Sequence, residues 1–541
     1  MKRIGIWALI ILGTLFVIIK GLEWGIESKF QDRINSNPDR TYNITYSDFD
    51  LDSFFRGVTL DNVNITPINT PSGNIIRGQV DYAAVNGLVW TDLLFGKRLN
   101  LDEIAFVQPE FEVILGADTN RKTSGKGLQE MFGDILSRAE LNSFQIKDGS
   151  VIMRNSISQD IKGEIKRINI MATEIETDSI KFKYIIPFEV GNLSVDIEGA
   201  TFKPNDYTDI SLGSLHYNLK DKEILLKEIS LGYSIDWIEV SKCLGVQNDI
   251  IELNVKEIGI HQFEPSNDFY AQLDIVAKEV SVDELHIKLQ RNKNISRPPD
   301  TRKQEFQGII NSIPIEFLLE SLQISNSSVT YTELGVKKSE SGSIKIQDIN
   351  GSISGVTNMP EEQKSIGQLD AKLDASLLGK AEINVALVVP YNEETFSLAV
   401  AVGEMKMTNL NPTLKPLAGV ETVSGQIKKI QFHMDAGPIK SRNTLVFDYA
   451  NLNLKLIDEK SKNKAKKKVL LTAIVNGAIR PTNLPSQKKY LTAKYQSSRN
   501  VYRSPINYII QGLIQGFTRI VPRNLARKLL LKKGKKKGKR N

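Results

Sequence analysis

Residues whose side chains could do chemistry are few and scattered. The 541-residue chain has one cysteine, Cys243, and four histidines, His216, His261, His286 and His433. One cysteine cannot form an intrachain disulfide, and a Cys/His zinc site needs several ligands at short spacings. His216 and His286 lie in runs of alternating apolar and polar residues, where structural or surface histidines are expected. The sequence therefore predicts no catalytic residue, no metal site and no cofactor.

Three aspartates at alternating positions are the strongest candidates for metal binding. Asp48, Asp50 and Asp52 would share one face of a β-strand, and calcium prefers carboxylate oxygens. The glycine and the distal glutamate of an EF-hand loop are missing, so we interpret the three as a solvated strand face. Gly125-Lys126-Gly127 lacks the spacing of a phosphate-binding loop, and no dinucleotide-binding, serine-hydrolase or zinc-protease motif occurs. We therefore expect a protein that is not an enzyme.

The charge of the chain is concentrated at one end. The whole chain carries 70 Lys/Arg and 63 Asp/Glu, but residues 501–541 contain 12 basic and no acidic residues. Its apolar content of 41%, with 37 Gly and 19 Pro, is ordinary for a folded protein and excludes collagen-like or wholly disordered classes. The basic pI is therefore a property of the C-terminal tail, and the rest of the chain is slightly acidic.

The N-terminus has the pattern of a membrane anchor. Met1-Lys2-Arg3 precedes sixteen uncharged residues, Ile4 to Ile19, and Lys20 follows them. A helix of that length spans about 24 Å, and Lys20 and Trp24 can reach the interface on the far side. A cleaved signal peptide is the alternative, but no small-x-small cleavage site follows. The predicted anchor covers residues 1–25, with apolar positions Ile4, Trp7, Leu9, Leu12, Phe16 and Ile19. The positive-inside rule then places the body outside the cytoplasm.

The C-terminus predicts an amphipathic helix followed by a basic tail. Apolar residues recur at helical spacing from Ile506 to Val521, and Pro522 breaks the run. The last ten residues contain seven Lys/Arg. An apolar helix beside a basic run favours an anionic membrane surface, whereas a solvated tail and nucleic-acid binding are the less favoured alternatives. The predicted membrane-surface residues are Ile510, Leu513, Phe517, Lys532, Lys533, Lys535, Lys536 and Lys537.

Between residues 40 and 500 the dominant period is two. Alternation of apolar and polar residues, with turn-forming residues between the runs, predicts a long antiparallel β-sheet with one apolar face. Helices are expected only near 128–139, in part of 304–319 and at the C-terminus. If the apolar faces line an open groove, the lining residues are Leu215, Tyr217, Leu273, Ile275, Leu285, Ile287, Leu289, Ile383, Val385 and Leu387.

An internal repeat divides the sheet. LNSFQIKDGSVIM, residues 141–153, aligns without gaps on LESLQISNSSVTY, residues 319–331, with six identities in thirteen positions. Each copy follows a polar loop with a short helical segment, and a Gly-x-Ile-Lys strand comes next, at Gly163 and Gly342. These matching flanks favour duplication. With Arg297-Pro298-Pro299-Asp300 near the junction, we expect a first module at 26–300, a second at 301–500 and the helix and basic tail at 501–541.

The same segments are similar to AsmA-like bacterial envelope proteins. The similarity is carried by the N-terminal anchor and by YNITYSDFDLDSFFRGVTLDNVNI, LVWTDLLFGKRLNLDEIAFVQPEFEVIL, LNPTLKPLAGVETVSGQIKKIQF and YRSPINYIIQGLIQGF. The basic end from Lys532 is not something that family requires. The resemblance implies a single-pass inner-membrane protein whose periplasmic part is a long curled sheet, related in architecture to TamB and chorein-type lipid-transfer proteins.

Two functions from different classes follow from these expectations. A curled sheet with an open apolar face would bind or move phospholipids, with acyl chains and an anionic membrane surface as partners and no nucleic acid. A sheet closed by side-chain packing would instead be a non-enzymatic assembly scaffold for outer-membrane proteins, with other envelope proteins as partners. Covered and open apolar faces distinguish the two.

Overall fold

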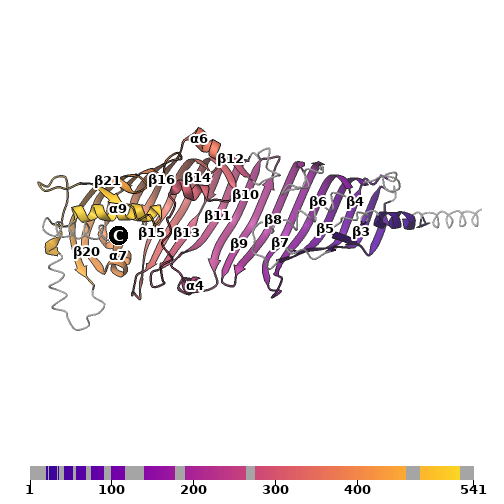
Figure 1. Cartoon of the computed structure of the whole chain (residues 1–541), viewed down its shortest axis with the longest axis horizontal. Coiled ribbons are helices and arrows are strands. Elements are labelled where there is room, and N and C mark those ends of the chain that lie inside the picture. The colour runs from indigo at the N-terminus through magenta and orange to yellow at the C-terminus, as the bar shows by residue number, and fades with distance from the viewer. Residues whose placement is uncertain are drawn as a thin grey trace, which may run out of the picture. The chain divides into compact units, whose positions relative to one another are not determined.

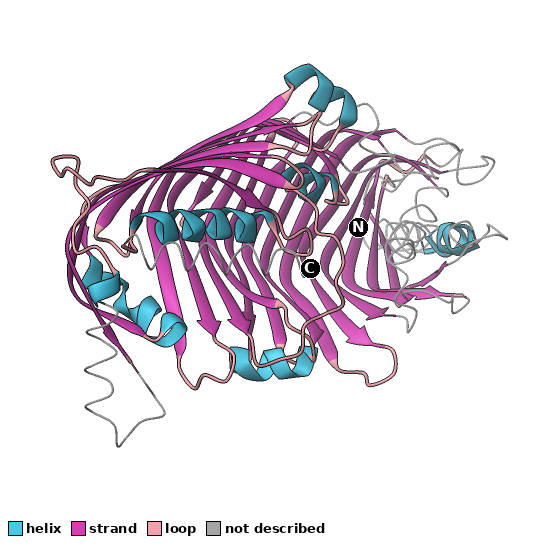
Figure 2. Cartoon of the chain, turned by 60° about the vertical axis from the view of Figure 1, so that its left-hand side comes forward, coloured by secondary structure: helices cyan, strands magenta, loops and turns pink. Residues whose placement is uncertain are grey.

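The computed structural model describes residues 20–21, 23–32, 35, 42–52, 56–68, 75–89, 99–115, 139–176, 189–263, 274–457 and 476–523. This part of the chain is mainly β, as the alternation predicts, and its 22 strands are assigned to one sheet. Figures 1 and 2 show how few helices accompany the strands. The chain divides into two compact units, Met1–Glu228 with Gln262–Asp274, and Ile229–His261 with Ile275–Asn541.

The predicted membrane anchor cannot be compared with the structure, because its core positions Ile4, Trp7, Leu9, Leu12, Phe16 and Ile19 lie outside the described residues. Within the described ranges, no helix has the length and hydropathy needed to cross a bilayer.

The first unit consists of strands, most of them long and paired antiparallel with their neighbours. Its strands are β1 (Tyr42–Thr45), β2 (Asp48–Leu51), β3 (Gly57–Pro67), β4 (Ile75–Asn86), β5 (Leu99–Leu115), β6 (Ala139–Asn155), β7 (Ile161–Glu176), β8 (Glu189–Asn205) and β9 (Thr208–Asn218), and β10 (Glu223–Tyr233) begins in it. One face carries the core, where Val80, Ile65 and Val63 are at most 2% exposed. Apolar residues at alternate positions therefore bury one face, as their period predicts.

The second unit contains the remaining strands and most of the described helices. Its elements are α4 (Trp237–Leu244), β11 (Asp249–Phe263), β12 (Asp274–Asp283), β13 (His286–Asn292), α5 (Phe306–Asn311), β14 (Glu316–Leu334), β15 (Ser341–Thr357), α6 (Pro360–Ile366), β16 (Gln368–Leu377), β17 (Ala381–Pro390), β18 (Phe396–Val402), β19 (Met405–Lys406), η2 (Met407–Leu410), α7 (Asn411–Ala418), β20 (Val420–Ala436), β21 (Lys440–Leu456), β22 (Ala493–Ser498) and α9 (Pro505–Ile520). Helices α5 and α9 confirm two of the predicted helical segments.

Two strand pairs correct the prediction of an all-antiparallel sheet. Strand β6 pairs in parallel with β5, and β14 pairs in parallel with β13. Both then pair antiparallel with the next strand, β7 or β15. A parallel neighbour requires the chain to cross back to the starting end, so it needs a long connection. The polar segment before each repeat copy supplies that connection, and its meaning was not recognised in the sequence.

The two repeat copies share a backbone detail as well as a pairing pattern. Asp148 in β6 and Asn326 in β14 occupy the same position of the repeat, and both have a left-handed backbone with φ of 50° and 51°. The backbone N–H of Asp148 donates to Asn169 Oδ1 at 2.8 Å, and that of Asn326 donates to Asn350 Oδ1 at 3.0 Å. The sequence match therefore corresponds to one recurring structure, a bulge held by an asparagine on the next strand.

These bulges reverse the phase of alternation along the strands. In β3 the buried apolar side chains are Val58 and Leu60 before Asn62, which has φ of 50°, and Val63 and Ile65 after it. The extra residue lets an even-numbered series continue as an odd-numbered one on the same face. Shifts of this kind are shared with the neighbouring strands, for example at Asn326 between β14 and β15.

Substituting Asn326 tests the cost of the bulge. Asn326→Val should lower the free energy of unfolding by about 1–2 kcal/mol more than Asn326→Gly, because a β-branched residue is strained at positive φ and glycine is not. Both variants lose the hydrogen bond from Asn326 Nδ2 to Asp283 Oδ1. The difference between their free energies of unfolding therefore reports the strain of a β-branched residue at this positive φ. Urea unfolding measures it, and equal stabilities of the two variants would contradict this account.

The C-terminal part of the second unit has a packed core. Leu445 and Tyr449 of β21 are fully buried, and α9 lies over β20, β21 and β22 with Tyr508, Gly512 and Gly516 toward the strands. Phe517 meets Phe447 edge-on, with ring centroids 4.8 Å apart. The amphipathic pattern of the helix is therefore satisfied in large part by the sheet.

Candidate functional site

The second unit has a row of apolar side chains that α9 does not cover. The strand register places Ile251 opposite Leu289 and Leu253 opposite Ile287. Strand β14 continues the two rows with Tyr331 and Val329, and β15 adds Ile344 and Ile346. Beyond Ile346 the row meets Leu377 of β16, where it joins the packed core of the second unit. Because directly paired residues lie on the same face, these eight side chains form one surface. We call it the apolar strip.

The apolar strip is only partly buried. Ile251 is 41% exposed, and the other seven members are half-buried. The opposite face of the same strands is closed at one end by α4, where Ile250 and Val240 are each 1% exposed. The strip is therefore a partly open apolar face on strands whose other face is covered at one end by α4 and exposed at Lys288.

One end of the strip is charged. Asp249, Arg291 and Glu333 are the next residues on the strip's face of β11, β13 and β14, and the register aligns them. Arg291 Nε lies 2.6 Å from Asp249 Oδ1, and Lys293 Nζ lies 2.6 Å from Glu333 Oε2. We call Asp249, Arg291, Lys293 and Glu333 the charged row.

Burial and neighbouring carboxylates determine the protonation states of Arg291 and Tyr331 at the charged end of the strip. Although burial favours its neutral form, the paired carboxylate of Asp249 raises the pKa of the Arg291 guanidinium. Burial and the hydrogen bond to Glu333 raise the pKa of the Tyr331 hydroxyl, which donates to Glu333 Oε2 at 2.8 Å. A permanent cation and a neutral phenol therefore stand where the apolar strip meets the charged row.

The structure brings together some of the predicted groove residues. Ile287 and Leu289 belong to the apolar strip, and Leu285 lies one residue before the start of β13. Ile275 is half-buried in β12, and Leu215 and Tyr217 are half-buried in β9 of the first unit. Leu273 lies outside the described residues.

Of the other predicted groove residues, Ile383 lies in the packed core, and Val385 and Leu387 lie beside it. Ile383 is 6% exposed, and Val385 and Leu387 pack against the same cluster. Helices α5 and α9 cover this part of the face: Phe306 meets Phe396 with ring centroids 5.1 Å apart. The expectation that Ile383 lines an open groove is corrected, because its side chain is buried. Val385 and Leu387 are half-buried, like most of the apolar strip, so their place in a groove stays a prediction.

The predicted membrane-surface residues of the C-terminal helix divide between its faces. Leu513 and Phe517 pack against the core of the second unit, whereas Ile510 is 46% exposed beside Ile506 and Ile514. The five lysines of the tail, Lys532, Lys533, Lys535, Lys536 and Lys537, lie outside the described residues. Membrane binding by this segment stays a prediction, with Ile506, Ile510 and Ile514 as the exposed apolar positions.

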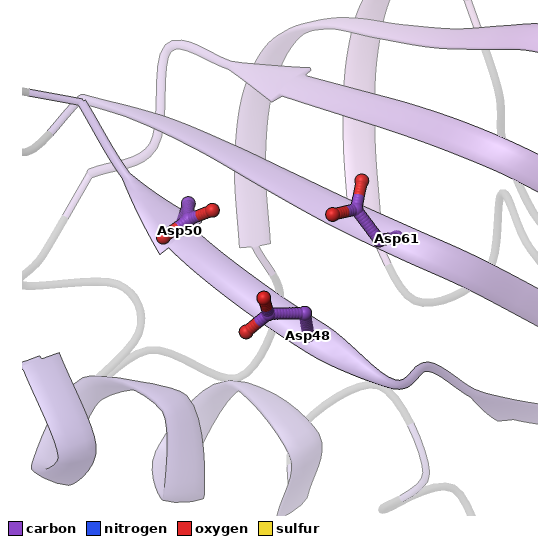
Figure 3. A group of neighbouring side chains, drawn as sticks. All are labelled: Asp48, Asp50 and Asp61. Atoms are coloured by element: carbon purple, nitrogen blue, oxygen red, sulfur yellow. The ribbon is translucent and has the colours of Figure 1, made fainter.

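The aspartates near the N-terminus form a different cluster from the one predicted. Asp48 and Asp50 lie on β2, and the third member is Asp61 on β3, with carboxylate oxygens of the three within 4.8 Å of one another (Figure 3). Asp52 instead accepts a hydrogen bond from the backbone N–H of Arg56 at 2.8 Å. Exposed carboxylates of this kind are common on strand surfaces, so the cluster does not define a cation site.

Several functional candidates were missed in the sequence. Ile251, Leu253, Ile344 and Ile346 alternate with polar residues, so their pattern was available. Val329 and Tyr331 follow the bulge at Asn326, which interrupts the alternation of apolar and polar residues along the strand. The pairing of Arg291 with Asp249 depends on register and had no local signal.

The fold and this surface define a mainly β protein with a partly open sheet face that is apolar along its length and charged at one end. Comparison with protein-family models and with curated proteins gives no match to the chain.

Proposed function

We propose that this protein binds phospholipids on the apolar strip and has no catalytic activity. The observation that carries the proposal is the register of four strands, which aligns eight half-exposed apolar side chains and then ends in the charged row. A phospholipid has the same sequence of chemistry, with acyl chains next to a charged headgroup. Burying acyl chains on such a face is favoured by about 25 cal/mol per Å² of apolar surface removed from water.

The resemblance to AsmA-like envelope proteins adds a cellular location and a role to this proposal. On that basis the chain is an inner-membrane protein anchored by residues 1–25, with its bulk in the periplasm, and it carries or moves phospholipids for maintenance of the outer membrane. The basic C-terminal segment would contact an anionic membrane surface, assisted by Ile506, Ile510 and Ile514.

An assembly scaffold for outer-membrane proteins is the second candidate. The packed core under α9 favours it, because α9 covers apolar side chains of β20, β21 and β22. The alternative predicts that the apolar strip is covered by a partner protein and that the purified protein carries no lipid.

Substituting Ile287 distinguishes the two functions. Ile287→Asp places a charge between Leu253 and Val329, in the middle of the strip. For a lipid-binding face we expect a folded variant, destabilised by about 1–3 kcal/mol, that carries several-fold less co-purified phospholipid. Mass spectrometry of organic extracts, after gentle detergent extraction of the full chain, measures the lipid.

The matched control is Lys288→Asn, one residue along the same strand. Lys288 lies on the opposite face, and its side chain is 55% exposed beside Glu252. This variant should keep the lipid content of the parent protein. A parent protein that purifies without phospholipid would overturn the proposal in favour of the scaffold.

A further inference from the structure

A polar cavity of about 370 Å³ opens beside the charged row, within the second unit. Four cationic side chains line it: Arg291 and Lys293 at the end of β13, Arg297 in the following segment, and Arg503 just before α9. No carboxylate is among its lining residues in the described part of the chain. The cavity therefore concentrates positive charge from segments more than 200 residues apart in sequence.

Two of the four cations are already neutralised by the charged row, and two are not. Arg291 is paired with Asp249, and Lys293 is paired with Glu333. Among the residues that the structure describes, Arg297 and Arg503 have no carboxylate partner. Arg503 is half-buried and has no counter-charge among these residues.

Neutral donors complete the lining. Asn507, Gln511 and Gln515 lie one turn apart on α9 and turn their side chains toward the cavity. Guanidinium groups and side-chain amides together supply the hydrogen-bond donors that phosphate oxygens accept from.

We propose that this cavity binds a phosphate group, and that in the protein's function this is the phosphate of a phospholipid whose acyl chains lie on the apolar strip. Arg297 and Arg503 supply the uncompensated charge, and the α9 amides donate to the remaining oxygens. The lipid source of the phosphate rests on the proposed function; the phosphate site itself does not.

The test uses the full chain in a nonionic detergent and the double variant Arg297→Gln/Arg503→Gln. Three probes separate the sources: dihexanoyl phosphatidylglycerol, dihexanoylglycerol without a phosphate, and glycerol 3-phosphate. We expect the double variant to bind the phospholipid at least tenfold more weakly, which corresponds to about 1.4 kcal/mol, and to bind dihexanoylglycerol like the parent protein. The control Lys364→Gln/Lys429→Gln removes the same charge from exposed positions of the second unit and should bind all three probes like the parent protein.

The other possible results separate the phosphate site from the phospholipid-binding function. Phospholipid binding that the double variant leaves unchanged, or that the control weakens equally, overturns the phosphate site while lipid binding stands. Binding of glycerol 3-phosphate alone, lost in the double variant, supports the phosphate site and overturns the phospholipid function. An equal loss for dihexanoylglycerol and for the phospholipid would mean that the arginines do not act on phosphate, and would also overturn the site.

Discussion

Replacing Arg499 by methionine is expected to lower the free energy of unfolding by about 3–5 kcal/mol, because it leaves a buried carboxylate without its counter-charge. The side chains of Arg499 and Glu305 are 0% and 2% exposed, and they form an ion pair. Arg499 Nη2 also donates to the carbonyl of Lys303 at 2.8 Å. The pair joins the start of α5 to the segment between β22 and α9, so its loss should loosen the packing of both helices.

The loss of stability caused by Arg499→Met should depend on pH. Burial raises the pKa of the Glu305 carboxyl, and the Arg499 guanidinium opposes that rise. A raised folded-state pKa means that the stability contributed by this group is full below its ordinary pKa of 4.5 and is lost as the pH rises through the raised value. Without Arg499 the pKa is higher still. The stability difference between parent and variant should therefore be small near about pH 4 and large near about pH 8.

Urea unfolding followed by circular dichroism at the two pH values measures this effect. The double variant Glu305→Gln/Arg499→Met removes both charges and should recover part of the lost stability at the higher pH. An Arg499→Met variant that unfolds at the same urea concentration as the parent protein at both pH values would show that the pair does not hold α5 and α9.

Two glycines of α9 should respond to alanine in opposite directions. A Cβ on Gly516 would lie 2.5 Å from Tyr495 Oη and 2.6 Å from Leu445 Cδ2, whereas on Gly512 its nearest neighbour would be Phe432 Cζ at 3.4 Å. Tyr495 cannot easily move, because its hydroxyl donates to the Gly512 carbonyl at 2.7 Å and Arg519 lies over its ring. Gly516→Ala should therefore destabilise the second unit by about 1–3 kcal/mol.

Gly512→Ala is the matched control on the same face of the same helix. Alanine is a better helix former than glycine by about 1 kcal/mol, and the space at this position accepts a methyl group. We expect this variant to be as stable as the parent protein or more stable. Thermal unfolding compares the two variants, and equal effects would mean that α9 does not pack as closely as the structure shows.

The sequence predicted the positions of the strands better than the short helices or the direction in which the strands pair. Alternation identified the long β segments and one apolar face, because the period of two is a local property of the chain. The helices α4, α6 and α7 were missed, since they are only seven or eight residues long and too short for a helical period to stand out. The parallel pairs were missed because pairing direction depends on a connection and leaves no period in the strand itself.

For the candidate site, the sequence found part of the apolar strip and none of its charged end. Ile287 and Leu289 were predicted because they alternate within one strand. Ile383 was assigned to the same surface by the same pattern, but α5 and α9 bury that part of the face. Alternation shows which side of a strand is apolar; what covers that side is decided by segments far away in sequence.

The row of bulges makes the strands sensitive to changes of length. Deleting one residue at Asn326 would restore strict alternation and turn Val329 and Tyr331 to the opposite face, together with Glu333. Two-residue changes would preserve the side that each half of the strand presents, but would shift its register against the neighbours. During evolution, single insertions and deletions in such strands should therefore be rejected. Length variation among relatives of this protein should accumulate in the turns and in the long connections that precede β6 and β14.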